Sequence, residues 1–302
     1  MTPEPAIETW DLSKRYGPVQ VVAPLSLTVP PGIVFGYLGP NGAGKTTTLR
    51  MLSGVLTPTG GAGRVAGAPL SDPDGVKARI GYANQAASVY TDLTVEENLR
   101  FKAALYLPPR AVPDAVDRTL ARLGLAPWRR HLARALSGGW RQRLSIGTAI
   151  VHGPQVLFLD EPTAGLDPVA RRDLWDAIYA LTGEGTTVFV TTHYMDEAER
   201  CQQVALIASG QILAQGAPEQ LRAGLPGVRY ALRALNLNAA LHAARATPGV
   251  QGAWIIGDEV RVTAADPGPE TALAALGDLR RVPASLEDVF VAYASAPAGV
   301  SA

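Results

Sequence analysis

Short apolar runs bounded by turn residues alternate with helix-like segments along most of the chain. The runs Gly32–Leu38, Val156–Leu159 and Thr186–Thr191 are apolar or β-branched throughout, which predicts buried strands. Helices are predicted over Lys45–Ser53 and from Asp167 onward, because an Asp followed by Pro is typical of a helix start. Strands and helices in alternation favour an α/β core with a largely parallel sheet.

The composition changes near Ala223–Gly227, where we predict a linker. Beyond it the pattern is strand, helix, strand, strand, helix, strand, which suits a small ferredoxin-like α+β domain. Apolar and polar residues alternate in Val260-Arg261-Val262, which lets such a domain bury one face of its sheet. We therefore expect two domains, one over residues 1–223 and an accessory one over residues 224–302.

A glycine-rich loop follows the first of these strands and precedes a helix. It reads Gly39-Pro40-Asn41-Gly42-Ala43-Gly44-Lys45-Thr46 and matches the P-loop pattern G-x-x-x-x-G-K-[ST]. Glycines let main-chain N–H groups converge on phosphate oxygens, and the helix N-terminus adds partial positive charge. Lys45 is predicted to reach the β- and γ-phosphates, and the Thr46 hydroxyl to ligate Mg²⁺. The loop therefore predicts a site for a nucleoside triphosphate.

Two adjacent acids, Asp160 and Glu161, come directly after the apolar strand Val156–Leu159. Asp160 at the strand end is a candidate ligand of Mg²⁺, either directly or through water. Glu161 is a candidate general base that polarises the attacking water. Acids at strand ends are common, so this pair gains its meaning from the P-loop.

A P-loop is shared by kinases, GTPases and motors, so the segment Leu136-Ser137-Gly138-Gly139 is more discriminating. Here the chain resembles the ATPases of ATP-binding cassette (ABC) transporters, whose signature reads LSGGQ. The resemblance implies that Ser137, Gly138 and Gly139 bind the γ-phosphate of an ATP held by the opposite subunit. Trp140 replaces the signature Gln, and we expect this departure to be tolerated because the phosphate-binding residues are present.

The same resemblance, over roughly residues 5–222, assigns the other site residues. It implies a helical subdomain over about 86–152, a catalytic Gln85 that senses Mg²⁺ and the lytic water, and a catalytic His193 at the γ-phosphate. It implies that Ala164–Asp167 crosses to the partner subunit. The implied ATP-binding residues are Tyr16 on adenine, Gly39, Pro40, Asn41, Gly42, Ala43, Gly44, Lys45, Thr46, Thr47, Ser137, Gly138, Gly139 and Asp167, and the implied Mg²⁺ ligands are Thr46, Gln85 and Asp160.

A finer resemblance is carried by Thr192–Arg200 and by Ser285-Leu286-Glu287-Asp288-Val289-Phe290. These segments look like the daunorubicin-exporter branch, whose members have one cassette and a short C-terminal domain. The resemblance implies an exporter ATPase that works as a homodimer with a separate polytopic permease, using ATP and Mg²⁺. It also implies that the permease's cytoplasmic helix docks on Ala86–Leu107.

Charge and cysteine content restrict the alternatives. Lys plus Arg and Asp plus Glu both number 27, so the net charge of zero gives no support for a nucleic-acid partner. The single cysteine, Cys201, excludes an internal disulfide and a cysteine-cluster zinc site. Met1–Trp10 does not resemble a signal peptide, and no apolar run approaches the roughly 18 residues of a membrane span. We therefore expect a cytoplasmic protein held at the inner face of the membrane by its permease.

Two other hypotheses predict features that this sequence does not show. An ABC ATPase acting on DNA or ribosomes would carry long insertions or two cassettes, and a degenerate cassette would lack some of Lys45, Asp160, Glu161 and His193. Both are less well supported than a transporter ATPase. Between Asp117 and Asp160 the chain has no acid, which indicates either a positive field for the partner's nucleotide or a solvated helix face. This stretch contains seven arginines, Arg118, Arg122, Arg129, Arg130, Arg134, Arg141 and Arg143.

Overall fold

Strand β3 (Val34–Leu38) is buried along its whole length and lies inside a mostly parallel sheet. It pairs in parallel with β8 (Thr187–Thr192) on one side and with β9 (Gln203–Ala208) on the other. Parallel strands are covered on both faces, which is why they were predictable as continuous apolar runs. The sheet has the order β10-β9-β3-β8-β7-β6, completed by β10 (Gln211–Gly216), β7 (Val156–Asp160) and β6 (Ile80–Ala83).

The parallel strands bring three distant segments to one edge of this sheet. Leu38 lies opposite Thr192, and Asp160 lies opposite Thr191, so β3, β7 and β8 end together. The loops that leave carboxyl ends of neighbouring parallel strands form the usual ligand crevice of α/β proteins. The P-loop, Glu161 and His193 all follow these strand ends.

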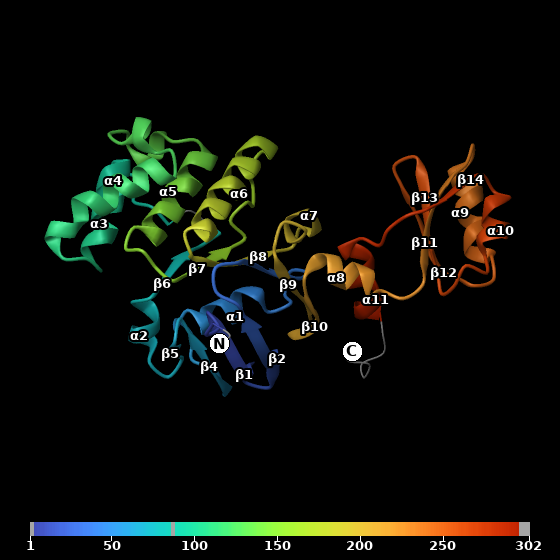
Figure 1. Ribbon diagram of the computed structural model, residues 1–302, viewed down its shortest axis with the longest axis horizontal. Coiled ribbons are helices and arrows are strands. Elements are labelled where there is room, and N and C mark those ends of the chain that lie inside the picture. The colour runs from blue at the N-terminus through green and yellow to red at the C-terminus, as the bar shows by residue number, and fades with distance from the viewer. Residues whose placement is uncertain (1–2, 86–87, 296–302) are drawn as a thin grey trace. The chain divides into compact units, whose positions relative to one another are not determined.

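An antiparallel sheet packs against helix α1 (Lys45–Leu52) and the parallel sheet (Figure 1). Its buried side chains, among them Ile7, Leu27 and Val65, join Leu49 and Phe35 in one hydrophobic cluster. The sheet has the order β2-β1-β4-β5 and consists of β1 (Ile7–Tyr16), β2 (Val19–Val29), β4 (Gly60–Val65) and β5 (Ala68–Pro69).

Helices α3 (Val95–Ala104), α4 (Val112–Arg122) and α5 (Gly138–Ile150) pack on one another at one side of the parallel sheet (Figure 1). Helix α3 begins with a capping box. The Thr94 hydroxyl accepts from the N–H of Glu97, whose carboxylate accepts from the N–H of Thr94. Three further helices of this part are α2 (Pro73–Lys77), α6 (Pro168–Gly183) and α7 (Met195–Ala198).

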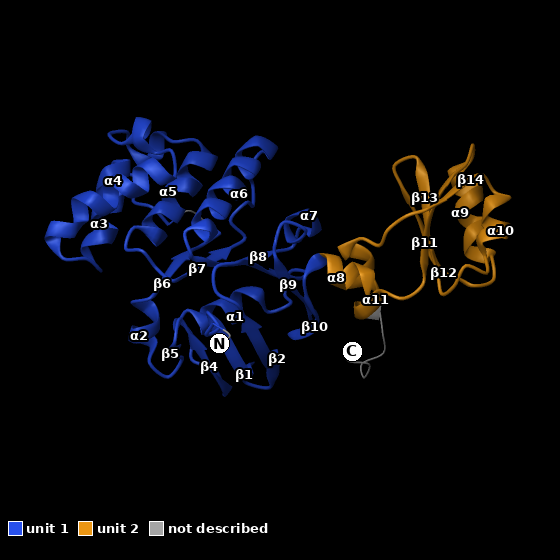
Figure 2. Ribbon diagram, in the orientation of Figure 1, with its two compact units in different colours: residues 1–218, 301–302 blue, residues 219–300 orange. Residues whose placement is uncertain are grey.

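The computed structural model describes residues 3–85 and 88–295, and it divides the chain into two compact units (Figure 2). The first unit runs to Pro218, and the second begins at Glu219. Residues 86–87, where the expected helical subdomain and docking stretch begin, and residues 296–302 at the end of the expected accessory domain lie outside the described part. No helix of the described part is long and apolar enough to cross a membrane.

Residues 228–281 of the second unit have the strand and helix order that the sequence predicts, and helices at Pro218–Ala223 and Leu286–Ser295, which the sequence analysis did not predict, precede and follow them. Its antiparallel sheet has the order β12-β13-β11-β14, and Tyr230, Leu232, Val260 and Val262 are buried in its core. This βαββαβ arrangement confirms the predicted ferredoxin-like fold. Its elements are α8 (Pro218–Ala223), β11 (Val228–Arg233), α9 (Leu237–Ala246), β12 (Val250–Ile256), β13 (Glu259–Ala264), α10 (Glu270–Ala274), β14 (Asp278–Arg281) and α11 (Leu286–Ser295).

Candidate nucleotide site

The glycines of the P-loop stand where other residues would not fit. Gly42 and Gly44 have φ angles of 82° and 97°, in the left-handed region that favours glycine. A Cβ atom at Gly44 would lie 2.9 Å from the carbonyl oxygen of Val21, and one at Gly39 only 2.4 Å from that of Ile207. The loop is thus held against the neighbouring strands, with its main chain exposed toward the space above helix α1.

The N-terminus of α1 is arranged to receive an anion. No side chain caps this helix, and its first turn contains no acid, so its free N–H groups have no acceptor from a capping side chain. The Lys45 side chain is only 5% exposed, and its Nζ donates to the carbonyl oxygens of Gly39 at 2.8 Å and Pro40 at 3.2 Å. A buried amine and a row of N–H groups therefore face the same space.

A pocket of about 380 Å³ lies over this loop, and we call it the P-loop pocket. It brings together residues of the loop, of β2 and of two segments that lie far away in sequence. Its lining residues are Val21, Asn41, Gly42, Gly44, Lys45, Thr46, Thr47, Gln85 and Glu161.

The Glu161 carboxylate is surrounded by three of the predicted site residues. Its Oε1 lies 3.3 Å from Nζ of Lys45, and its Oε2 accepts from Nε2 of Gln85 at 3.3 Å. Nδ1 of His193 lies 3.4 Å from the same Oε2. The structure therefore brings the predicted general base together with the predicted lysine, glutamine and histidine.

Asp160 and Glu161 are both held by Thr191, a residue that the sequence analysis missed. Oγ1 of Thr191 donates to Oδ1 of Asp160 at 2.6 Å and accepts from the N–H of Glu161 at 3.0 Å. Glu161 has a φ of 46°, a strained conformation that persists only where its surroundings hold it. Thr46 also donates to Oδ1 of Asp160, at 3.3 Å. The signal in the sequence that could have identified Thr191 is its place as a polar residue at the end of the apolar strand Thr186–Thr191.

Ser137 and Asp167 lie in a second pocket of about 200 Å³, the signature pocket. Ser137 is the N-cap residue of α5 but makes no side-chain capping bond, and the first turn of α5 contains no acid. Asp167 instead caps its own helix, accepting from the N–H groups of Val169 and Ala170. The residues that line the signature pocket, none of which lines the P-loop pocket, are Ser137, Gly139, Trp140, Arg143, Asp167, Val169, Ala170 and Asp173.

Tyr16 is the last residue of β1 and is half exposed, with the amine of Lys14 lying 5.3 Å from its ring centre. Tyr16 is not among the residues that line the P-loop pocket. The lining residue from the antiparallel sheet is Val21 on β2. The expected contact between the Tyr16 ring and adenine therefore stays a prediction.

Trp140, which replaces the signature glutamine, packs locally instead of facing open solvent. Its ring centre lies 5.6 Å from that of Trp128, and the Arg143 guanidinium lies 4.8 Å above the ring. Arg143 also pairs with Asp173 at 3.2 Å. The aromatic ring thus forms one wall of the signature pocket without displacing Ser137 or Gly139 from it.

Four of the seven arginines of the acid-free stretch, Arg122, Arg129, Arg134 and Arg143, pair with acids from neighbouring segments. Arg129 donates to Glu96 and Asp117, and it holds the pKa of Glu96 down, to about 2. Arg122 pairs with Glu184, and Arg134 with Asp92 at 2.8 Å. These pairs offset the charge of four arginines, which favours a solvated, ion-paired helical surface over a free positive field.

The buried parallel strand, the glycine loop, the helix N-terminus and the acid pair on the neighbouring strand define a P-loop nucleotide-binding protein. A family model described as "ABC transporter" matches residues 22–164. The daunorubicin/doxorubicin resistance ATP-binding protein DrrA of Streptomyces peucetius is 39% identical over 98% of this chain and 94% of its own length. This chain belongs to the family of ABC transporter ATP-binding proteins, which hydrolyse ATP.

Two further comparisons cover 73% and 74% of this chain. The probable multidrug ABC transporter ATP-binding protein YbhF of Escherichia coli (strain K12) is 43% identical over 73% of this chain, which spans only 38% of that relative. The solved structure of cbiO1 from Clostridium perfringens, described as part of the ABC transporter complex cbiONQ, aligns with a TM-score of 0.69. It is 26% identical and covers 74% of this chain and 92% of its own.

Proposed function

We propose that this chain is the ATP-hydrolysing subunit of an exporter, and that it drives a separate membrane permease through a dimer with two ATP molecules between the subunits. One observation carries the proposal. Lys45, Gln85 and Glu161 line one pocket and His193 contacts Glu161, whereas Ser137 lines a different pocket of the same chain. Two copies facing each other would complete each P-loop pocket with the other copy's signature pocket. The name of the Streptomyces relative, which refers to drug resistance, supports export.

The residues present fit ATP together with Mg²⁺. The uncapped N-terminus of α1 and the buried Lys45 amine suit phosphate oxygens, and Thr46 and Asp160 offer hard oxygen ligands beside them. No group of three or more His, Cys, Asp or Glu side chains in the described part could hold a metal. Mg²⁺ at Thr46 and Asp160 would therefore need nucleotide oxygens and water, and when bound it would neutralise phosphate charge.

The chain's own residues suit a hydrolysis in which Glu161 takes a proton from water. The Thr191 hydroxyl fixes the Glu161 main chain, while Gln85 and His193 orient the carboxylate from two sides. General-base assistance of this kind contributes about 10²–10⁴-fold to a rate. Lys45 supplies positive charge at the P-loop, where the negative charge of the phosphates would lie.

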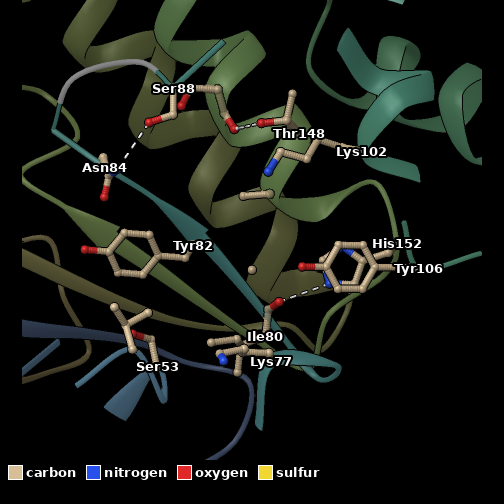
Figure 3. A pocket seen from close by; sticks show the side chains of 14 residues that line it. Ser53, Lys77, Ile80, Tyr82, Asn84, Ser88, Lys102, Tyr106, Thr148 and His152 are labelled. Carbon is tan, nitrogen blue, oxygen red and sulfur yellow. Dashed lines mark hydrogen bonds between the residues drawn. The ribbon is translucent and has the colours of Figure 1, made fainter. Parts of the chain in front are cut away.

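A docking site for the permease is proposed in the pocket next to Gln85, which we call the docking pocket (Figure 3). It has a volume of about 370 Å³ and lies among β6, α3 and α5. Tyr106 lines it and stacks on His152, with 4.1 Å between ring centres. Tyr90, in the loop before α3, and Phe101 on α3 are both exposed, with 5.0 Å between their ring centres, and add apolar surface outside the pocket.

The charge of the docking pocket favours an acidic contact from the permease. Lys77 and Lys102 line the pocket, and none of its described lining residues is acidic. Burial, together with the nearby charge of Lys102, lowers the pKa of His152 and outweighs the opposite effect of its hydrogen bond to the carbonyl oxygen of Ile80, so His152 adds no charge near neutral pH. A permease helix that carries a carboxylate among apolar side chains would match both features.

Charge reversal in the docking pocket should weaken permease binding. In Lys102→Glu the pocket would repel an acidic partner, and we expect roughly tenfold weaker association or more, because facing like charges cost several kcal/mol. The measurement is co-purification of the chain with a co-expressed permease, at two salt concentrations. Arg64→Glu on β4, an equal charge change on an exposed residue outside the pocket, is the matched control. Strong crosslinks from residues 228–295, with none from 88–107, would contradict this docking site.

The second unit is proposed to serve assembly or permease pairing, without a part in nucleotide binding. Its buried Tyr230 and Leu232 belong to a core that is separate from the core of the first unit. A chain that ends at Pro218 should therefore bind ATP as the full chain does, while dimer stability, permease association or transport is lost. ATP titration and analytical ultracentrifugation of both chains test this. Unfolding of the shortened chain, or loss of ATP binding, would show that the second unit is integral to the first.

A further inference from the structure

The side chain of Glu197 is completely buried, yet nothing in the proposed mechanism uses it. It lies on the short helix α7, four residues after His193 and far in sequence from Glu161. Burying a carboxylate is unfavourable unless hydrogen bonds or charges compensate for the lost water. Its partners therefore indicate what it does.

Two threonine hydroxyls donate to the Glu197 carboxylate. Oγ1 of Thr192 donates to Oε2 at 2.7 Å, and Oγ1 of Thr163 donates to Oε1 through a short hydrogen bond. Because Thr192 Oγ1 already accepts the N–H of Tyr194 at 3.0 Å, its single proton is directed to the carboxylate. The carboxylate thus acts only as an acceptor.

A third contact comes from Arg171 on α6. Its Nε lies 3.6 Å from Oε1 of Glu197, too far for a hydrogen bond but close enough for charge attraction. The Arg171 guanidinium also lies 4.8 Å above the ring of Tyr194, whose ring centre is 4.0 Å from that of His193. The positive charge of Arg171 therefore lies beside both Glu197 and the histidine segment.

The two threonines lie next in the chain to Glu161, which lines the P-loop pocket, and to His193, which contacts Glu161. Thr192 immediately precedes His193, and Thr163 is separated from Glu161 only by Pro162. Thr163 also begins the turn into Ala164–Asp167, since its carbonyl oxygen accepts the N–H of Leu166 at 3.1 Å. One carboxylate therefore ties the histidine segment to the acid segment and to the loop that leads to the signature pocket.

We infer that Glu197 is a positioning residue for ATP hydrolysis, which holds Glu161 and His193 in register and links both to the loop Ala164–Asp167. The inference rests on the proposed roles of Glu161 and His193. Thr191 fixes Glu161 from its N–H side, and the Glu197–Thr163 bond fixes the chain that follows it. With both in place, the strained φ of 46° at Glu161 is held from both directions.

The test separates turnover from nucleotide binding in the full chain. In Glu197→Gln, an amide cannot accept from both hydroxyls in the same way, and we expect kcat to fall roughly 10- to 100-fold, as for a misplaced catalytic group. The KM for ATP and the affinity for a fluorescent ATP analogue should stay close to those of the wild type. Asp176→Asn, at an exposed acid on α6, is the matched control.

Paired threonine variants keep the test valid if Glu197→Gln folds poorly. Thr192→Val and Thr163→Val remove the hydroxyl that donates the hydrogen bond and keep the shape of the side chain. Thr192→Ser and Thr163→Ser keep the hydroxyl. We expect the serine variants to turn over nearly as the wild type does and the valine variants to lose kcat. The losses in Thr192→Val and Glu197→Gln should not add in the double variant. Thr119→Val, at a buried threonine bonded to the Ala115 carbonyl, is the control for burial.

The outcomes distinguish this inference from the proposed function. If Glu197→Gln and the valine variants keep the wild-type kcat while Glu161→Gln is inactive, only the role of Glu197 is overturned. A parallel rise in KM would also overturn it, because the residue would then serve binding. Wild-type turnover in Glu161→Gln would instead refute the proposed chemistry itself.

Discussion

Replacement of Glu161 by glutamine should lower ATP turnover by roughly 10²–10⁴-fold, the range that general-base assistance contributes. Glutamine keeps the size of the side chain and can still contact Lys45 and Gln85, but its amide cannot take a proton from water. Affinity for ATP should remain, because the glycine loop and the N-terminus of α1 are unchanged. Steady-state phosphate release and an equilibrium ATP titration measure the two effects separately. Glu219→Gln, at an exposed position, is the matched control.

The same variant should trap the proposed dimer. If two ATP molecules lie between a P-loop pocket and the other copy's signature pocket, blocked hydrolysis leaves them there. Light scattering of Glu161→Gln should then show a dimer with ATP and Mg²⁺ and a monomer with ADP. A variant that hydrolyses ATP as fast as the wild type would contradict the role of Glu161. A variant that is inactive but stays monomeric with ATP would contradict the dimer.

Replacement of Lys45 by alanine should weaken nucleotide binding itself. The buried amine is the cation that faces the P-loop, and losing a hydrogen bond to a charged group costs about 1.5–3 kcal/mol, so the Kd for ATP should rise roughly 10- to 100-fold. Titration with a fluorescent ATP analogue measures this, and hydrolysis at non-saturating ATP should fall at least in proportion.

Lys77→Ala provides the control for this second substitution. Lys77 is about half exposed, pairs only weakly with Asp74 at 3.5 Å and does not line the P-loop pocket, so its loss should leave the Kd for ATP unchanged. Equal weakening in the two variants would mean that overall charge, and not the buried amine, attracts the nucleotide. An unchanged Kd in Lys45→Ala would refute the assignment of this loop to phosphate binding.

The strands that carry the site could be predicted because their signals are local. β3, β7 and β8 are buried on both faces, and such strands read as uninterrupted apolar runs. The P-loop is likewise a contiguous motif, whose glycines are required by the close approach of Val21 and Ile207. Sequence and structure therefore agree on where the glycine-rich loop lies, between β3 and α1.

The residues that hold the site together could not be predicted, because their partners are distant in sequence. Thr191 donates to Asp160, which lies 31 residues away in the sequence, and Glu197 accepts from Thr163, which lies 34 residues away. A threonine near a strand end and an acid on a short helix are ordinary features on their own. Only the order in which β3, β8 and β7 pair makes them neighbours.

The placement of Lys45 and Ser137 in separate pockets has a genetic consequence. A proposed dimer whose two subunits both lack Lys45, or both lack Ser137, would have two damaged sites. A cell that makes both defective versions would also form mixed pairs. In each mixed pair one site carries both defects and the other carries neither, so two inactive alleles could restore part of each other's activity.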